Sequence, residues 1–221
     1  MAGGSLTLER GLRVLRVLAE QPDGLSVSEL ADDLETHRAG IYRLLVPLAA
    51  ERLVVRGADG RYTLGLGLLE LASAVRSRLQ EVAVRELRRL ADEVRATTAL
   101  TVRDGDEAVV AAVVEPTSTV MHIAYRPGLR HPLDRAAPGL AILAGGPALP
   151  GEREEVALGR ERGWTLTSGE LLPGATGIGV PIPSRGQGGE ASISAVWIEQ
   201  RDPVAAAGPV MRAAHAIAAA L

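Results

Sequence analysis

The sequence has no cysteine, and it also lacks phenylalanine, lysine and asparagine. Without cysteine, disulfides, thiolate metal sites and cysteine nucleophiles are excluded, and a reducing compartment is compatible with the chain. The four histidines form no HExxH motif and no close pair, which makes a metal site a poor hypothesis. We therefore expect neither a metal nor another cofactor.

Long apolar runs are also missing. No window approaches the roughly 20 apolar residues that a membrane span requires, and no apolar run follows a basic N-terminal segment. We expect a cytoplasmic protein without membrane association. The net charge of −3 argues against a basic surface over the whole protein. Any contact with nucleic acid would therefore use a local cluster of arginines.

The stretch 26–61 has the order of elements found in winged helix-turn-helix DNA-binding domains. Ser26 and Glu29 form a capping box, which predicts a helix over about 27–34. A longer helix follows, with its apolar residues on one face. A strand, a turn and a second strand over about 53–64 then predict a hairpin, the wing of such domains.

The longer helix is expected to present a basic face. Its apolar positions leave Arg38, Tyr42 and Arg43 outward near the N-terminal end, which enters the major groove in this motif. Guanidinium groups bond phosphate or guanine, and a tyrosine hydroxyl bonds phosphate. A solvated helix face is the alternative. Thr36 is expected to cap the helix, and Pro47 predicts a bend or an early end.

At 221 residues the chain has room for two modest domains. We place a DNA-binding domain at 6–65, a linker helix at 66–80 and a second domain at 81–221. In the second domain, helical patterns and apolar β-branched runs indicate an α+β fold around one sheet. Helices are expected near 81–95, 138–145, 152–162 and 203–221, and strands near 97–103, 107–115, 120–125, 175–183 and 190–199.

Four passages carry a family resemblance: TLERGLRVLRVLA, HRAGIYRLLVPLAAERLV, DGRYTLGLGLLELA and GLRHPLDRAAPGLAILA. Together they resemble the IclR family of bacterial transcriptional regulators over nearly the whole chain. The resemblance implies a winged helix-turn-helix joined to a GAF-like α+β effector-binding domain. It also implies a homodimer or a dimer of dimers, a palindromic operator in double-stranded DNA, and a small-molecule effector such as an organic acid or an aromatic catabolite.

The resemblance assigns DNA contact to the start of the longer helix and to the wing. Relatives usually carry Ser-Thr where this chain has Ala39-Gly40, so we expect its operator affinity or sequence preference to differ. Arg61 would be the wing contact, with an exposed hairpin charge as the alternative. The predicted DNA-binding residues are Thr36, Arg38, Ala39, Gly40, Tyr42, Arg43 and Arg61.

The resemblance also implies a ligand pocket in the second domain. Some relatives line it with an acid, a thiol and two serines, whereas this chain keeps one serine and one threonine. We therefore expect a less polar or bulkier ligand than a small 2-oxo acid. The alternative is that these residues only pack the domain interior. The predicted effector-binding residues are Ala137, Pro138, Thr167, Gly177, Ser194 and Val196.

Two patterns resemble enzyme motifs only superficially. The glycine-rich stretch 174–179 lacks the GK[ST] of a phosphate-binding loop and is expected to open a strand rather than a helix. Ser168 and Ser194 stand in no GxSxG motif. We therefore expect no enzyme. The remaining alternative to a regulator is a ligand-binding or scaffold protein whose winged helix contacts another protein.

Overall fold

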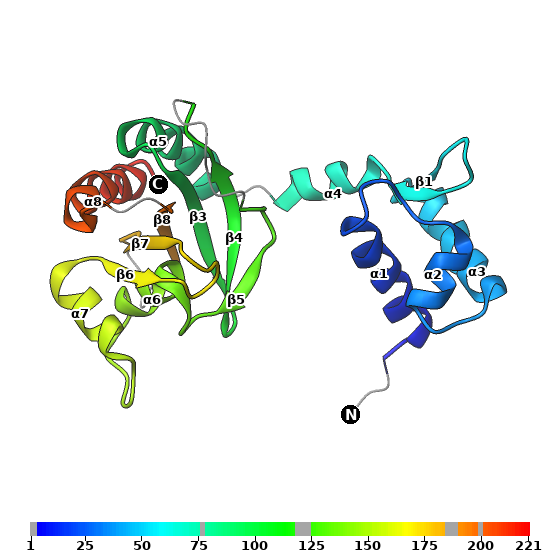
Figure 1. The fold of residues 1–221 in the computed structure, drawn as a ribbon, viewed down its shortest axis with the longest axis horizontal. Helices are drawn as coiled ribbons and strands as arrows, with labels where there is room; N and C mark the ends of the chain where they lie inside the picture. The colour runs from blue at the N-terminus through cyan, green and yellow to red at the C-terminus, as the bar shows by residue number, and fades with distance from the viewer. Residues whose placement is uncertain (1–3, 76–77, 118–124, 184–189, 199–200) are drawn as a thin grey trace. The chain divides into compact units, whose positions relative to one another are not determined.

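The chain forms two compact units, Met1–Arg76 and Ser77–Leu221, each with its own apolar core (Figure 1). The division falls within 66–80, where the sequence predicts a linker. Most of the strand expected near 120–125 and the turn expected at 185–189 lie outside the described residues. The computed structural model describes residues 4–75, 78–117, 125–183, 190–198 and 201–221.

The N-terminal unit begins with three helices, α1 (Leu6–Ala19), α2 (Val27–Asp33) and α3 (Arg38–Ala50). They meet around an apolar core to which α1 contributes Val14 and Leu18, α2 contributes Leu30, and α3 contributes Ile41 and Leu45. In each helix these residues share one face, so burying that face fixes the arrangement of the three helices.

A hairpin and a further helix complete this unit: β1 (Val54–Arg56), β2 (Tyr62–Leu64) and α4 (Gly67–Val75). Gly60 has φ +82°, a left-handed conformation that suits glycine in the tight turn of the wing. Backbone hydrogen bonds of 2.9 and 2.7 Å join Leu25 and Tyr62 in both directions. These bonds hold the wing beside the start of α2, and the predicted winged helix-turn-helix is confirmed.

The C-terminal unit is built on a six-stranded sheet with the order β5-β4-β3-β8-β7-β6, in which every neighbouring pair is antiparallel. Its strands are β3 (Thr97–Asp104), β4 (Glu107–Val114), β5 (Arg130–Pro132), β6 (Thr165–Ser168), β7 (Thr176–Pro181) and β8 (Ala191–Trp197). Its helices are α5 (Arg78–Val94), α6 (Ala136–Ala144), α7 (Glu154–Arg162) and α8 (Pro203–Ala219).

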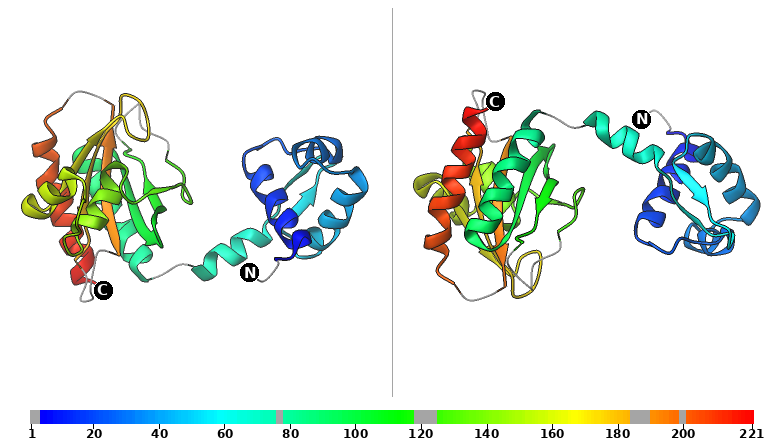
Figure 2. Two further views of the ribbon diagram at one scale, coloured as in Figure 1. Left: turned by 90° about the horizontal axis from the view of Figure 1, so that it is seen from below. Right: turned by 90° about the horizontal axis from the view of Figure 1, so that it is seen from above.

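Helices cover both faces of this sheet. Figures 1 and 2 show α5 and α8 together on one face and α6, with α7 beside it, on the other. Successive side chains of β8 point to opposite faces of the sheet, so the strand contributes to the packing on both faces. Ile193 and Ala195 belong to the large apolar core with α5 and α8, whereas the Ser192 hydroxyl donates a hydrogen bond to the Pro138 carbonyl of α6. The predicted α+β class is confirmed.

Several element boundaries differ from the expectation. The short strands β5 and β6 were not predicted, and α5 begins at Arg78 rather than near residue 81. α6 begins at Ala136, so that Pro138 lies in its first turn, where a missing N–H removes no intrahelical hydrogen bond. The sequence predicts a bend or an early end of α3 at Pro47; the early end is wrong, because the helix continues to Ala50.

Among the described residues, no helix has both the length and the apolar character of a membrane span. The same part of the chain contains no group of three or more histidine and acidic side chains placed to hold a metal ion.

Candidate nucleic-acid interface and ligand cavity

The N-terminal end of α3 turns the predicted DNA-contacting side chains away from the core. Arg38, Ala39 and Arg43 are exposed, and Tyr42 is 49% exposed. Within the described residues, the side chains of Arg38, Tyr42 and Arg43 form no hydrogen bond or ion pair. All three are therefore available to an outside partner.

Thr36 does not cap α3, which corrects the expectation from the sequence. The N-cap is His37, whose side chain makes no capping hydrogen bond. Thr36 instead lies against Gly40, where an added Cβ would stand only 3.3 Å from the Thr36 Oγ1. The glycine therefore leaves room for Thr36 beside the exposed face of the helix.

A surface hollow beside Gly40 brings in a residue that the sequence did not indicate. Both α1 and α3 line it, and Arg10 and Arg43 are its two cations, both exposed. The helical pattern of α1 shows that Arg10 is exposed, but not which neighbouring element it meets. The hollow is lined by Thr7, Arg10, Thr36, Gly40, Arg43 and Leu44.

Arg61 is turned toward the protein rather than away from the wing. Its Nε and Nη2 donate hydrogen bonds of 3.1 and 2.9 Å to the Gly24 carbonyl. Nη2 also forms an ion pair of 3.1 Å with the Glu29 carboxylate. The expected free wing charge is therefore already engaged, and direct DNA contact by Arg61 would require these bonds to break.

Glu29 joins this arginine to the predicted capping box, which is present. The Glu29 N–H donates to the Ser26 hydroxyl at 3.3 Å, and the Ser26 N–H donates to the Glu29 carboxylate at 2.7 Å. These bonds, followed by the contact with Arg61, lower the pKa of Glu29 to about 2. Among the wing arginines, Arg56 is the exposed one, and its guanidinium lies 5.9 Å from the centre of the Tyr62 ring.

In the C-terminal unit, the six predicted effector-binding residues line a single cavity between the start of α6 and the sheet. Its volume is about 20 Å³, room for about one water molecule. Most of the other lining residues come from the segment between β6 and β7, and the sequence did not indicate these. The complete lining is Tyr125, Ala136, Ala137, Pro138, Thr167, Glu170, Leu171, Leu172, Ala175, Gly177, Ser194, Ala195 and Val196.

The sheet holds the first turn of α6 through short hydrogen bonds. The Ala137 N–H donates to the Thr167 Oγ1 at 3.0 Å, and the Thr165 hydroxyl donates to the Ala137 carbonyl at 2.7 Å. Gly179 permits this close approach, since an added Cβ there would lie 2.3 Å from the Ala137 oxygen. Thr167 and Ala137 are therefore both structural partners and cavity residues.

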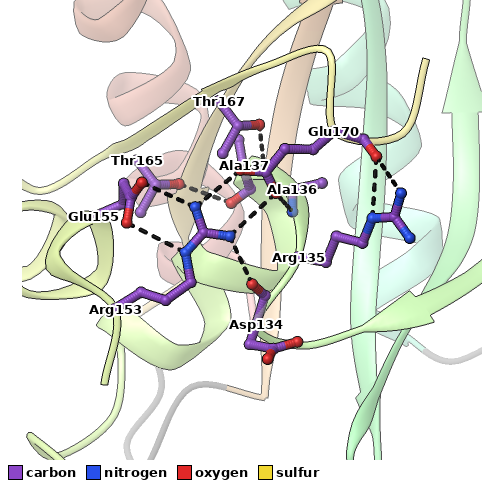
Figure 3. Close-up of polar contacts among 9 residues, drawn as sticks. All are labelled: Asp134, Arg135, Ala136, Ala137, Arg153, Glu155, Thr165, Thr167 and Glu170. Carbon is purple, nitrogen blue, oxygen red and sulfur yellow. Dashed lines mark hydrogen bonds and ion pairs between the residues drawn. The ribbon is translucent and has the colours of Figure 1, made fainter. Parts of the chain in front are cut away.

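Glu170 lines the cavity, and Figure 3 shows its contacts with the start of α6 and with Arg153. Its carboxylate accepts a hydrogen bond of 2.6 Å from the Ala136 N–H and pairs with both terminal nitrogens of Arg153 at 2.9 and 3.2 Å. Its backbone carbonyl accepts hydrogen bonds of 3.0 and 2.7 Å from Arg135. The loop carrying Glu170 is thus fastened to the start of α6.

These contacts keep Glu170 ionised. Burial raises the pKa of Glu170, but the hydrogen bonds from Arg153 and from the Ala136 N–H outweigh burial, so that its pKa is lowered. The pKa of Arg153 is raised, first by hydrogen bonds to Glu155 and then by those to Glu170. Ala136 has φ +63°, an unusual conformation for a residue with a Cβ, at the point that Glu170 contacts.

Two family models match the chain: the IclR helix-turn-helix domain over residues 7–58 and the bacterial transcriptional regulator IclR C-terminal domain over residues 71–150. The HTH-type transcriptional regulator Rv1719 of Mycobacterium tuberculosis is 35% identical over 158 residues, which are 71% of this chain and 60% of that protein. The Glycerol operon regulatory protein of Streptomyces griseus is 30% identical over 215 residues, 84% of this chain and 82% of that protein.

Solved structures show the same fold. The crystal structure of an IclR homologue from Microbacterium hydrocarbonoxydans, complexed with 4-hydroxybenzoate, superposes with a TM-score of 0.82 at 26% identity and covers 97% of this chain and 98% of that one. The Thermotoga maritima IclR structure gives a TM-score of 0.79 at 24% identity over 96% and 97% of the two chains. With matches in both units, the chain belongs to the IclR family of bacterial transcriptional regulators.

Proposed function

We propose that this cytoplasmic protein binds a palindromic operator in double-stranded DNA through the start of α3 and the wing. The observation that carries the proposal is the exposed face of α3, where Arg38, Tyr42 and Arg43 have no partner within the described chain. Arg10 and Arg56 add exposed cations from α1 and the wing. Arg61 stabilises the wing through its contacts with Gly24 and Glu29. Thr36, Ala39 and Gly40 complete the contact surface.

We infer that the cavity beside α6 is the effector site, and that the effector is an organic acid or an aromatic compound. The convergence of Ala137, Pro138, Thr167, Gly177, Ser194 and Val196 on one cavity supports this assignment. The related crystal structure with 4-hydroxybenzoate, an aromatic compound, supports the ligand class.

Ligand binding must change the structure of the C-terminal unit, because the cavity is small. A volume of about 20 Å³ cannot hold an organic ligand, so binding must widen the space between α6 and the sheet. A ligand that binds only the widened form shifts the population toward it, whereas a ligand with equal affinity for both forms shifts nothing.

The regulator is proposed to act as a homodimer or a dimer of dimers. Two recognition helices must then match half-sites that lie about 34–36 Å apart, or a multiple of this distance. A ligand-induced change in the arrangement of the subunits would alter that spacing and hence the operator affinity.

The proposal is tested by a gel shift with the DNA upstream of the protein's own gene. We expect wild type to bind and Arg38→Ala/Arg43→Ala to lose binding, while Arg89→Ala, which removes an exposed arginine of α5, binds normally. If no salt-sensitive complex forms, the regulator proposal fails. The alternative is then a scaffold protein whose winged helix contacts another protein.

A further inference from the structure

The lining of the α6 cavity contains one charged side chain, and that charge is negative. Glu170 is this residue; arginine and histidine are absent from the lining within the described chain. Among the described lining residues, an anionic ligand would therefore meet one carboxylate and no cation.

The backbone donors at the start of α6 are also occupied. A helix N-terminus normally attracts anions through its free N–H groups. Here the Ala136 N–H already donates to the Glu170 carboxylate, and the Ala137 N–H donates to the Thr167 hydroxyl. The next residue is Pro138, which has no N–H. Glu170 thus takes the place that a ligand carboxylate would otherwise occupy.

Of the two arginines that contact Glu170, Arg153 is neutralised by carboxylates, whereas Arg135 donates to the Glu170 backbone carbonyl. Arg153 pairs with Glu170 at 2.9 Å and with Glu155 at 2.9 Å. These three side chains together carry one net negative charge, so Arg153 does not offer an unmatched positive charge to a ligand.

One buried polar group remains unused. Ser194 lines the cavity with only 3% of its surface exposed, and its hydroxyl has no hydrogen-bond partner within the described chain. The wall around it is largely apolar, with Leu171, Leu172 and Val196. A hydroxyl in such a setting suits a ligand with one uncharged hydrogen-bonding group and an apolar body.

We propose that Glu170 is the specificity-determining residue of this cavity, which selects uncharged ligands and rejects carboxylates. The inference rests on the proposed effector function of the cavity, and of the two proposed ligand classes it retains uncharged aromatic compounds and excludes organic acids. A carboxylate about 5 Å from Glu170 would meet repulsion large enough to weaken binding by at least about tenfold.

The experiment compares acids with amides of nearly the same shape. Calorimetry on the full chain at pH 7.5 measures binding of 4-hydroxybenzoate, phenylacetate and hexanoate, and of the three corresponding amides. We expect at least one amide to bind wild type about tenfold or more tightly than its acid. Glu170→Gln should raise the affinity of the acid and remove most of this preference.

Glu154→Gln is the matched control, because Glu154 is an exposed carboxylate of α7 that lies outside the cavity lining. It should leave the preference for the amide unchanged. Circular dichroism checks that each variant folds, and the wild-type comparison of acid and amide needs no variant.

Three results would overturn the proposal: an acid that binds wild type as tightly as its amide, a preference that survives in folded Glu170→Gln, or failure of every amide to bind. The gel shift is independent of this measurement. If DNA binds but acids are preferred, only the ligand selectivity is wrong; if DNA does not bind, the regulator proposal falls whatever the calorimetry shows.

Discussion

Two glycines on the same face of β7 have different relations to α6. An added Cβ at Gly177 would meet Ala137 and Val196 at ordinary contact distances of 3.7 and 4.0 Å. An added Cβ at Gly179 would collide with the Ala137 carbonyl oxygen at 2.3 Å. Gly177 therefore leaves space in the cavity, whereas Gly179 lets the helix approach the sheet.

We predict that Gly177→Ala folds normally but weakens ligand binding by about tenfold, because one methyl group fills the cavity. Gly179→Ala should instead lower the free energy of unfolding by about 2 kcal/mol, since α6 must move away. Urea unfolding and calorimetry with the amide probes measure the two effects. Unchanged ligand affinity in Gly177→Ala would show that the ligand binds elsewhere.

A second residue-scale prediction separates Arg61 from Arg56. Arg61→Ala should lower the free energy of unfolding of the N-terminal unit by about 1–2 kcal/mol, because it removes the hydrogen bonds to Gly24 and the ion pair with Glu29. Arg56→Ala should leave stability unchanged and weaken DNA binding. Chemical unfolding and gel shifts measure both variants. If Arg61→Ala weakens DNA binding without loss of stability, Arg61 contacts DNA directly.

Sequence reasoning found residues of the cavity but not the contacts that define its chemistry. The six predicted residues were reached through the family resemblance and lie together. Glu170 was missed because it lies 34 residues from the backbone N–H that it contacts, so no local pattern connects them. Arg61 follows a turn, which indicates an exposed side chain. Its guanidinium group instead donates a hydrogen bond to the carbonyl of Gly24, 37 residues away.

At the scale of elements, the capping box of α2 makes a prediction about pH. The folded protein lowers the pKa of Glu29 from 4.5 to about 2, so it favours the ionised carboxylate more than the unfolded chain does. The resulting stability is fully present above about pH 5 and is lost as the pH falls toward 2. The start of α2 should therefore loosen across this range.

Hydrogen exchange of the α2 amides between pH 6 and 2, corrected for intrinsic rates, measures this effect. Glu29→Gln should remove most of the pH dependence, whereas Glu20→Gln, at an exposed position after α1, should retain it. Identical pH profiles for wild type and Glu29→Gln would contradict the assignment.

Elements with a complete local signal were predictable, and those that depend on neighbours were not. α2 follows from its capping box. β5 has only three residues, one of them Pro132, and becomes a strand by pairing with β4. α6 starts before Pro138 because contacts from Glu170 and Thr167 hold its first two N–H groups.

At the scale of the whole molecule, exposed leucines on and beside α4 are a candidate surface for the proposed oligomer. Leu66, Leu69 and Leu71 are 77%, 66% and 59% exposed. Exposed apolar patches are typical of protein contact surfaces. This is consistent with the proposed oligomer.

Leu69→Asp should therefore reduce the mass measured by light scattering and weaken operator binding, because the two half-sites are then no longer bound by linked subunits. Leu149→Asp is the control, since Leu149 is 57% exposed in the segment between α6 and α7. An unchanged mass for Leu69→Asp would exclude this surface as the interface.

The central claim is that an acidic protein binds DNA through a local arginine surface at α3. Fluorescence anisotropy with the upstream DNA, measured as Kd against salt concentration, tests it most directly. Affinity should fall steeply with salt, and the slope should drop by about 1 in Arg38→Ala and in Arg43→Ala, but not in Arg89→Ala. Binding that is insensitive to salt, or a slope unchanged in both α3 variants, would contradict the claim.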